Sequence, residues 1–200
     1  MSPRIPAENK RLKEERKEEI LQAAAKVLAY KGYAATKIAD IAAAAKVSHG
    51  LVYHYFKSKE EIYLALADRI GQAAAALRLS LAQPGAPREK VRMMLERMLA
   101  AVRDYPEHYV LAVQMMTTEG VAPAALEKVF TGGREGQEAM AQVIAAGQAA
   151  GVFRPGDPRQ HFYLLYAAIN GLAIVQAFSR RSGQMMADVS AETIMRLIEP

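Results

Sequence analysis

Residues 46–62, KVSHGLVYHYFKSKEEI, gather two histidines, three lysines, a serine and two tyrosine hydroxyls into a short, partly apolar segment. Hydroxyl, imidazole and ammonium groups donate hydrogen bonds to phosphate oxygens and to the edges of nucleic-acid bases. The same groups also serve as nucleophiles, bases and metal ligands in enzymes. The spacing of these residues decides between the two kinds of chemistry.

The spacing argues against catalysis. Ser48 and His49 are adjacent, which does not suit a nucleophile and its base, and His161 lacks the helical partner of a zinc site. The glycine-rich run at 132–136, GGREG, lacks the lysine and the serine or threonine of a phosphate-binding loop. The chain has no cysteine, which excludes disulfides and thiolate sites. We therefore expect no enzyme activity, no metal and no cofactor.

Positive charge is concentrated in the first third of the chain. Residues 1–60 carry 12 of the 26 Lys and Arg but only 7 of the 21 Asp and Glu, so they account for the whole net charge of +5. Six lysines and a single acid, Asp40, lie between Lys26 and Lys59. Such a cationic field attracts polyanions such as nucleic acid, although a basic face that only maintains solubility is an alternative.

The elements that must position these residues are helices, because the chain is rich in Ala, Leu, Glu, Lys and Met and has no sustained alternation typical of strands. We expect an all-α fold of about nine helices, with a break or kink in the seventh at Gly132, Gly133 and Gly136. The ranges are 11–31, 37–45, 49–55, 59–81, 88–104, 106–118, 123–150, 158–181 and 191–199. Thr36, Ser48 and Ser58 are the expected N-caps of the second, third and fourth helices.

Two short helices joined by a tight turn inside the basic region predict a helix-turn-helix, whose second helix enters the major groove of DNA. Within 49–55, Val52 faces inward and is followed by the inward-facing Phe56. His49, Gly50, Tyr53 and His54 lie on the outer face. We expect a flexible arm at 1–13, a DNA-binding domain of three helices with the start of a fourth at 14–74, and a second helical domain at 75–200.

The segment from Ile20 to Leu66 resembles the DNA-binding region of the tetracycline-repressor (TetR) family of bacterial transcriptional regulators. The matching pieces are ALKG-type spacing from Ala24 to Tyr33, Thr36 with Ile41-Ala42, and VSHGLVYHYFKSKE at 47–60. The rest agrees in helix count and in the turn GVFRPGDP at 151–158. The resemblance implies a homodimeric regulator, most simply a repressor, that binds a palindromic or near-palindromic operator and is released by a small, largely apolar inducer.

The resemblance also implies roles for individual residues. Thr36 and Tyr53 would hold phosphates with help from His54 and Lys59, whereas Lys37, His49 and Gly50 would lie nearest the base edges. Leu51 could contact a thymine methyl group. Lys46 stands where the turn often carries glycine and could contact a phosphate. The full expected DNA-binding set is Thr36, Lys37, Lys46, Ser48, His49, Gly50, Leu51, Tyr53, His54, Lys57 and Lys59.

Two further sets are expected in the second domain. Soft apolar residues with a few polar groups suit a ligand pocket, although methionines and aromatics of this kind more often form plain core. The expected ligand set is Met98, Tyr109, Met115, Phe130, Tyr163, Tyr166 and Asn170. The last two helices suit pairing with a second copy, and the expected dimer set is Ile169, Leu172, Val175, Phe178, Ile194 and Leu197.

The apolar run at 162–178 is shorter than the roughly 20 residues of a membrane span, so we expect a helix buried on most sides within the protein. The N-terminal residues contain no apolar stretch typical of a secretion signal. These features favour a cytoplasmic protein that does not enter the membrane. The alternative function is a dimeric helical scaffold that binds a ligand or a protein without DNA, but this alternative does not explain the basic first third.

Overall fold

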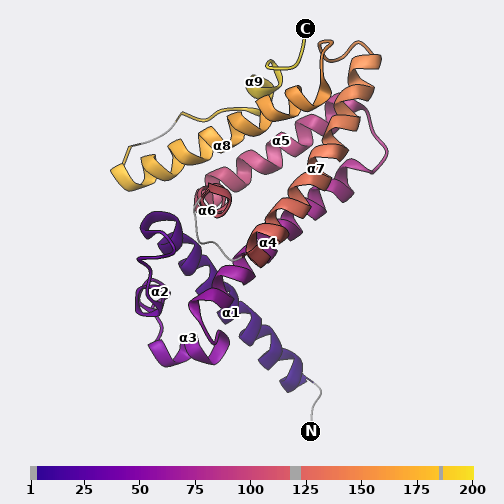
Figure 1. The fold of residues 1–200 in the computed structure, drawn as a ribbon. Coiled ribbons are helices and arrows are strands. Elements are labelled where there is room, and N and C mark those ends of the chain that lie inside the picture. The colour runs from indigo at the N-terminus through magenta and orange to yellow at the C-terminus, as the bar shows by residue number, and fades with distance from the viewer. Residues whose placement is uncertain (1–3, 118–122, 185–186) are drawn as a thin grey trace. The chain divides into compact units, whose positions relative to one another are not determined.

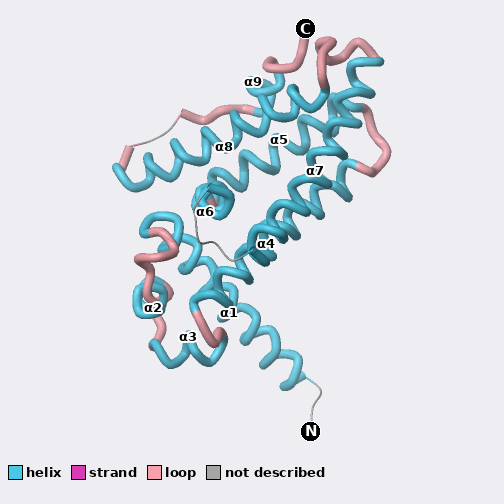
Figure 2. Tube along the Cα trace, in the orientation of Figure 1, coloured by secondary structure: helices cyan, strands magenta, loops and turns pink. Residues whose placement is uncertain are grey.

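The computed structural model describes residues 4–117, 123–184 and 187–200, with side chains from residue 8 onward. Its described residues form helices joined by turns and loops, without a strand, which confirms the all-α prediction (Figures 1 and 2). The helices are α1 (Arg4–Lys31), α2 (Ile38–Ala44), α3 (His49–Tyr55), α4 (Lys59–Leu81), α5 (Pro87–Asp104), α6 (Pro106–Thr117), α7 (Pro123–Ala149), α8 (Pro158–Ser182) and α9 (Ala191–Met195).

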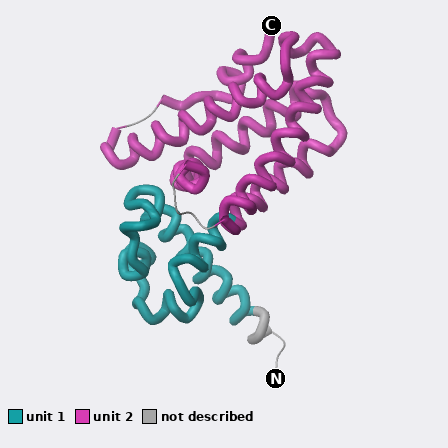
Figure 3. The backbone as a smooth tube through the Cα atoms, viewed as in Figure 1, with its two compact units in different colours: residues 1–67 teal, residues 68–200 magenta. Residues whose placement is uncertain are grey.

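The chain divides into two compact units, residues 1–67 and 68–200 (Figure 3). The division lies within α4, after Ala67 rather than after residue 74 as expected. One helix therefore begins in the first unit and continues into the second.

The core of the first unit is built from one face of α1 and the inward faces of α2, α3 and α4. Ile20 and Leu28 from α1, Ile41 from α2, Val52 from α3 and Ile62 from α4 are all fully buried. Burying side chains of this size stabilises each by roughly 1.5–3 kcal/mol relative to solvent exposure. These five residues fix the positions of the three short elements that follow α1.

Helix α1 begins earlier than the sequence predicted. It is helical from Arg4, so the expected flexible arm over residues 1–13 is wrong for residues 4–13, while residues 1–3 lie outside the described residues. Pro6 falls within the first turn, where a missing backbone N–H costs no helical hydrogen bond. Arg11 pairs with Glu8 and Glu15 along the exposed surface, which supports the helix at spacings of three and four residues.

The expected break in α7 is absent, and the helix runs without interruption past its glycines. A Cβ on Gly132 would lie 2.9 Å from the carbonyl oxygen of Gly71 in α4, and a Cβ on Gly71 would lie 2.8 Å from that of Lys128. The glycines therefore allow the backbones of α4 and α7 to approach closely, and tertiary packing outweighs their low helix propensity.

The second unit is organised around a core shared by α5, α7, α8 and α9. Leu95, Ile144, Leu165, Ile169 and Met195 are buried in this cluster. Buried side chains recur on one face of α8 at spacings of four residues, as expected for a helix with one face in a core. The C-terminal residues are thus part of the fold of this unit.

Arginines tie the ends of these helices together. Arg88 at the start of α5 donates to Glu192 and to Glu199, at 2.6 and 2.8 Å. Arg180 near the end of α8 donates to the carbonyl oxygens of Arg103 and Asp104, where α5 ends and leaves carbonyls without helical partners. The positive charge there also complements the helix dipole.

Candidate nucleic-acid interface

Helix α3 is held rigidly by its cap and by one buried face. The Ser48 hydroxyl accepts a hydrogen bond from the backbone N–H of Leu51 at 3.2 Å, which confirms the predicted N-cap. Val52 is fully buried, and Phe56, directly after the helix, is 1% exposed. The opposite face is consequently fixed in position without making core contacts itself.

That opposite face carries His49, Gly50, Tyr53 and His54, all exposed. The rings of His49 and Tyr53 meet edge to face with centroids 5.0 Å apart, and Tyr53 is 48% exposed. No heavy atom lies within 4 Å of the position that a Cβ on Gly50 would occupy. Nothing within the protein requires a glycine there, so its small size suits close approach by an external surface.

The turn between α2 and α3 has a left-handed residue. Lys46 has a φ of +55°, a conformation that costs a residue with a Cβ roughly 1–2 kcal/mol. Its backbone N–H donates to Ala43 at 3.2 Å, and that of Val47 donates to Ala42 at 3.0 Å, which closes the end of α2. The lysine thus adopts the geometry that glycine favours, and its side chain is exposed beside α3.

Three exposed lysines surround this face: Lys37, Lys46 and Lys57. The side chains of Lys46 and Lys57 make no ion pair among the described residues. Leu51 is partly buried, so only part of its side chain is available for an apolar contact. The exposed set combines donors on a short helix with unneutralised positive charge around it.

Two predicted phosphate-binding residues have a different role. Thr36 is 2% exposed, and its hydroxyl donates to the carbonyl oxygen of Gly32 at 2.6 Å. The ammonium of Lys59 donates to the carbonyl oxygens of Tyr33 and Thr36, at 2.6 and 2.9 Å, and lies 4.3 Å from the centre of the Tyr33 ring. Because their donors are engaged inside the unit, both residues hold the α1–α2 loop against the start of α4.

The cap of α2 also differs from the prediction. Lys37, not Thr36, is the N-cap residue, and its backbone N–H donates to the Asp40 carboxylate at 2.7 Å. Lys31 donates to the same carboxylate at 2.6 Å. The hydrogen bond from Lys31, followed by that from Lys37, lowers the pKa of Asp40 below its usual value.

Sequence reasoning missed this carboxylate as a structural element, although Asp40 was visible as the single acid among six lysines. It joins the end of α1 to the start of α2. Ser58 at the start of α4 does accept from the N–H of Glu61 at 3.1 Å, as predicted, while the Glu61 carboxylate accepts from the N–H of Lys57 at 2.6 Å. The ends of α2 and α4 are thereby both secured beside α3.

In the second unit, four of the seven predicted ligand residues are linked by contacts. The Tyr109 hydroxyl lies 3.4 Å from the carbonyl oxygen of Met98, and burial, with a smaller contribution from Tyr166, raises the pKa of Tyr109 to about 12. The amide nitrogen of Asn170 donates to the carbonyl oxygen of Tyr166 at 2.8 Å. Its buried amide oxygen has no hydrogen-bond partner among the described residues.

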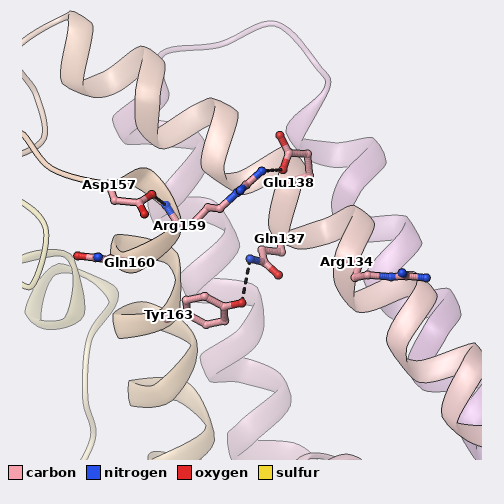
Figure 4. Close-up of a pocket in the computed structure, with 7 residues that line it drawn as sticks. All are labelled: Arg134, Gln137, Glu138, Asp157, Arg159, Gln160 and Tyr163. Carbon is pink, nitrogen blue, oxygen red and sulfur yellow. Dashed lines mark hydrogen bonds and ion pairs between the residues drawn. The ribbon is translucent and has the colours of Figure 1, made fainter.

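The other three predicted ligand residues lie elsewhere. Met115 is fully buried, whereas Phe130 and Tyr163 are exposed on the surfaces of α7 and α8. Tyr163 alone of the predicted set lines a surface hollow of about 540 Å³ between α7 and the start of α8 (Figure 4). Its other lining residues are polar or charged: Arg134, Gln137, Glu138, Asp157, Arg159 and Gln160.

Contacts across this hollow keep its polar groups engaged. Arg159 donates to Glu138 at 3.1 Å, and Gln137 donates to the Tyr163 hydroxyl at 3.0 Å (Figure 4). Its open, charged lining does not match the predicted apolar pocket. A smaller hollow of about 170 Å³, lined partly by Leu99, Val102 and Val189, lies elsewhere and contains none of the predicted ligand residues.

Helix α8 is less buried than the sequence suggested. Val175 and Phe178 are 48% and 64% exposed, and Leu197 beyond α9 is also exposed. Ile169 and Ile194, by contrast, are buried in the core of the second unit and cannot contact another copy, so they are corrections to the predicted dimer set. By length and composition α8 could also cross a membrane, but its apolar face at Ile169 is already packed within the protein.

Known proteins resemble the chain along most of its length. Residues 20–66 match the family described as "Bacterial regulatory proteins, tetR family", and residues 84–198 match "Tetracyclin repressor-like, C-terminal domain". The HTH-type transcriptional repressor NicS of Pseudomonas putida is 30% identical over 161 residues, which are 76% of this chain and 73% of NicS. The HTH-type transcriptional repressor Rv3405c of Mycobacterium tuberculosis is 50% identical over 52 residues, covering 26% and 28% of the two chains.

Solved structures share the fold. The crystal structure of the MbdR regulator from Azoarcus sp. CIB superposes with a TM-score of 0.73, covering 91% of this chain and 94% of that one at 24% identity. At this identity the likeness speaks for the arrangement of helices and not for shared ligands.

Proposed function

Because the chain belongs to the TetR family of bacterial transcriptional regulators, we propose that its exposed α3 face reads an operator in the major groove of DNA. The chain is a DNA-binding regulator and not an enzyme. Regulators of the family bind operators and form dimers. What remains to be proposed is which residues of this chain bind DNA, pair the two copies and respond to an inducer.

The observation that carries the DNA-binding proposal is the exposed face of α3 on a helix fixed by its buried face. His49 and Tyr53 present hydrogen-bond donors from a backbone that need not reorganise on binding, and Gly50 permits close approach. Lys46 and Lys57 beside this face neutralise phosphates. We assign the reading of base edges to His49 and phosphate contacts to Tyr53, Lys46 and Lys57, with Lys37 and His54 at the margin.

We further propose that two copies pair through the exposed apolar residues of α8 and the C-terminal segment. Val175, Phe178 and Leu197 would leave apolar surface in water in a single copy, and pairing removes this surface from water. A symmetric pair presents two α3 helices to two operator half-sites, so a palindromic or near-palindromic operator follows from the symmetry. Such a protein acts in the cytoplasm, where the bacterial DNA is.

An inducer site is proposed at Met98, Tyr109, Tyr166 and Asn170, on α5, α6 and α8. The buried amide oxygen of Asn170 is an acceptor for a ligand that carries one hydrogen-bond donor on a largely apolar body. Release of DNA is a population shift, in which the ligand prefers a conformation with lower DNA affinity. Helix α4 is the proposed connection, because Lys59 anchors it in the first unit and Gly71 packs it against α7 in the second.

Tyr53→Phe tests the DNA-binding proposal, because it removes only a hydroxyl. The probe is a duplex selected by the wild-type protein from a random-sequence pool, and binding is measured by fluorescence anisotropy. A hydrogen bond to a charged group contributes about 1.5–3 kcal/mol, so we expect a loss of at least about tenfold in affinity. Tyr105→Phe, at an exposed tyrosine of the second unit, is the matched control and should bind like the wild type.

His49→Ala should relax sequence preference at one position of each half-site. If Tyr53→Phe and His49→Ala both bind the selected duplex with wild-type affinity and specificity, α3 is not the reading element. The inducer site is tested separately by thermal-shift screening with small, largely apolar compounds. Hits should lose their effect in Asn170→Ala and keep it in Phe130→Ala, since Phe130 lies outside the proposed site.

A further inference from the structure

The first half of α1 has its charges segregated by face. At about 100° per residue, Lys10, Lys13 and Lys17 lie within a sector of about 60°. This sector continues the line of Leu21, Ala24 and Leu28, which are buried residues of the same helix. The face that is apolar inside the unit thus becomes a lysine stripe, defined as Lys10, Lys13 and Lys17, where the helix extends beyond the body of the unit (Figure 1).

The remaining charges of this part of α1 are neutralised among themselves. Arg11 pairs with Glu8 and Glu15, and Arg16 pairs with Glu19, all on other faces of the helix. Lys10 and Lys13 are exposed and make no ion pair within the part of the chain that the structure describes. Glu14 borders the stripe but pairs with none of its three lysines. The stripe therefore retains its positive charge in the folded protein.

A contact fixes where the stripe lies. The Lys17 ammonium is 5.6 Å from the centre of the Phe56 ring, and Phe56 directly follows α3 and precedes Lys57. The stripe begins at the C-terminal end of the candidate DNA-reading helix and runs away from it along α1. From Lys10 to Lys17 it covers about 10 Å, which corresponds to about three base-pair steps of duplex DNA.

We propose that the lysine stripe binds phosphates of the DNA that flanks each half-site, outside the bases read by α3. This inference rests on the proposed function of α3. Ammonium groups spaced along one helical line suit a phosphate backbone, and the contact is independent of sequence because it reaches no base edge. The stripe lengthens the DNA segment that one protomer covers and raises affinity without changing operator specificity.

The test compares the wild type with Lys10→Gln/Lys13→Gln on two duplexes. Both contain the operator selected by the wild-type protein, one trimmed to its conserved core and the other extended by ten base pairs on each side. On the extended duplex the variant should bind at least about tenfold more weakly at 0.15 M salt. The slope of log affinity against log salt should fall by about 0.9 for each phosphate contact removed. On the trimmed duplex the two proteins should bind alike.

Lys26→Gln is the matched control for Lys13→Gln, because Lys26 is an exposed lysine on another face of α1. It should leave both affinity and salt slope unchanged. The inference is overturned if the double variant matches the wild type on the extended duplex, or if it loses affinity equally on both duplexes. Tyr53→Phe is measured in parallel, so that its loss of binding beside an intact double variant rejects the stripe alone and leaves the proposed function standing.

Discussion

The close crossing of α4 and α7 predicts opposite effects for two neighbouring glycines. Gly132 and Gly133 both lie inside α7, and replacing either by alanine gains about 1 kcal/mol of helix propensity. A Cβ on Gly132 would lie 2.9 Å from the carbonyl oxygen of Gly71 and 3.1 Å from its Cα. A Cβ on Gly133 meets no heavy atom within 4 Å. The two substitutions therefore share their chemistry and differ only in packing.

Because the atoms facing Gly132 belong to backbone, they cannot turn aside as a flexible side chain would. Forcing an extra methyl group into a packed interior costs roughly 1–3 kcal/mol. We expect Gly133→Ala to be about 1 kcal/mol more stable than the wild type and Gly132→Ala to be about 1–3 kcal/mol less stable than Gly133→Ala. The gain in propensity cancels in this difference, which leaves the cost of the clash.

The assay is unfolding in urea followed by circular dichroism, with the free energy of unfolding taken from the linear dependence on denaturant. Equal stability of the two alanine variants would refute the reasoning, because it would mean that α4 and α7 do not approach at Gly132. A large decrease in Gly133→Ala would also contradict it, since that site faces open space.

Three further substitutions test the first unit. Lys46→Gly should raise the free energy of unfolding by about 0.5–1 kcal/mol, because glycine avoids a left-handed strain of about 1–2 kcal/mol but has more freedom when unfolded; Lys46→Ala should bring no such gain, and both should lower the salt slope of DNA binding by about 0.9 per contact. Asp40→Asn should destabilise the protein at pH 7. The lowered pKa of Asp40 means that its contribution is present above its usual pKa and lost as pH falls, so the difference should close in acid, and urea unfolding from pH 7 down to pH 3 checks this. Burial, then Tyr33, raises the pKa of Tyr63 to about 12, so its stabilising contribution is complete below pH 10 and lost as pH rises through 12. Tyr63→Phe should make unfolding less sensitive to pH in this alkaline range, and an unchanged pH dependence would contradict the assignment.

The sequence by itself determined the helical class, the N-caps at Ser48 and Ser58, and the face of α3 that carries His49 and Tyr53. These features depend on local spacing: a helix repeats every 3.6 residues, and a cap lies within three residues of its partner. The positive φ at Lys46 was also anticipated, because the turn geometry is local to a few residues.

Only the tertiary structure decided which donors remain free. Lys59 and Thr36 have the right chemistry for phosphates, but the carbonyl oxygens of Tyr33 and Gly32 already accept their hydrogen bonds. In the same way, the neighbouring backbone of α4 decides that Gly132 preserves α7 instead of breaking it. Such contacts join atoms that are distant along the chain, so residue type and periodicity do not specify them, and they follow from which surfaces the folded protein buries together.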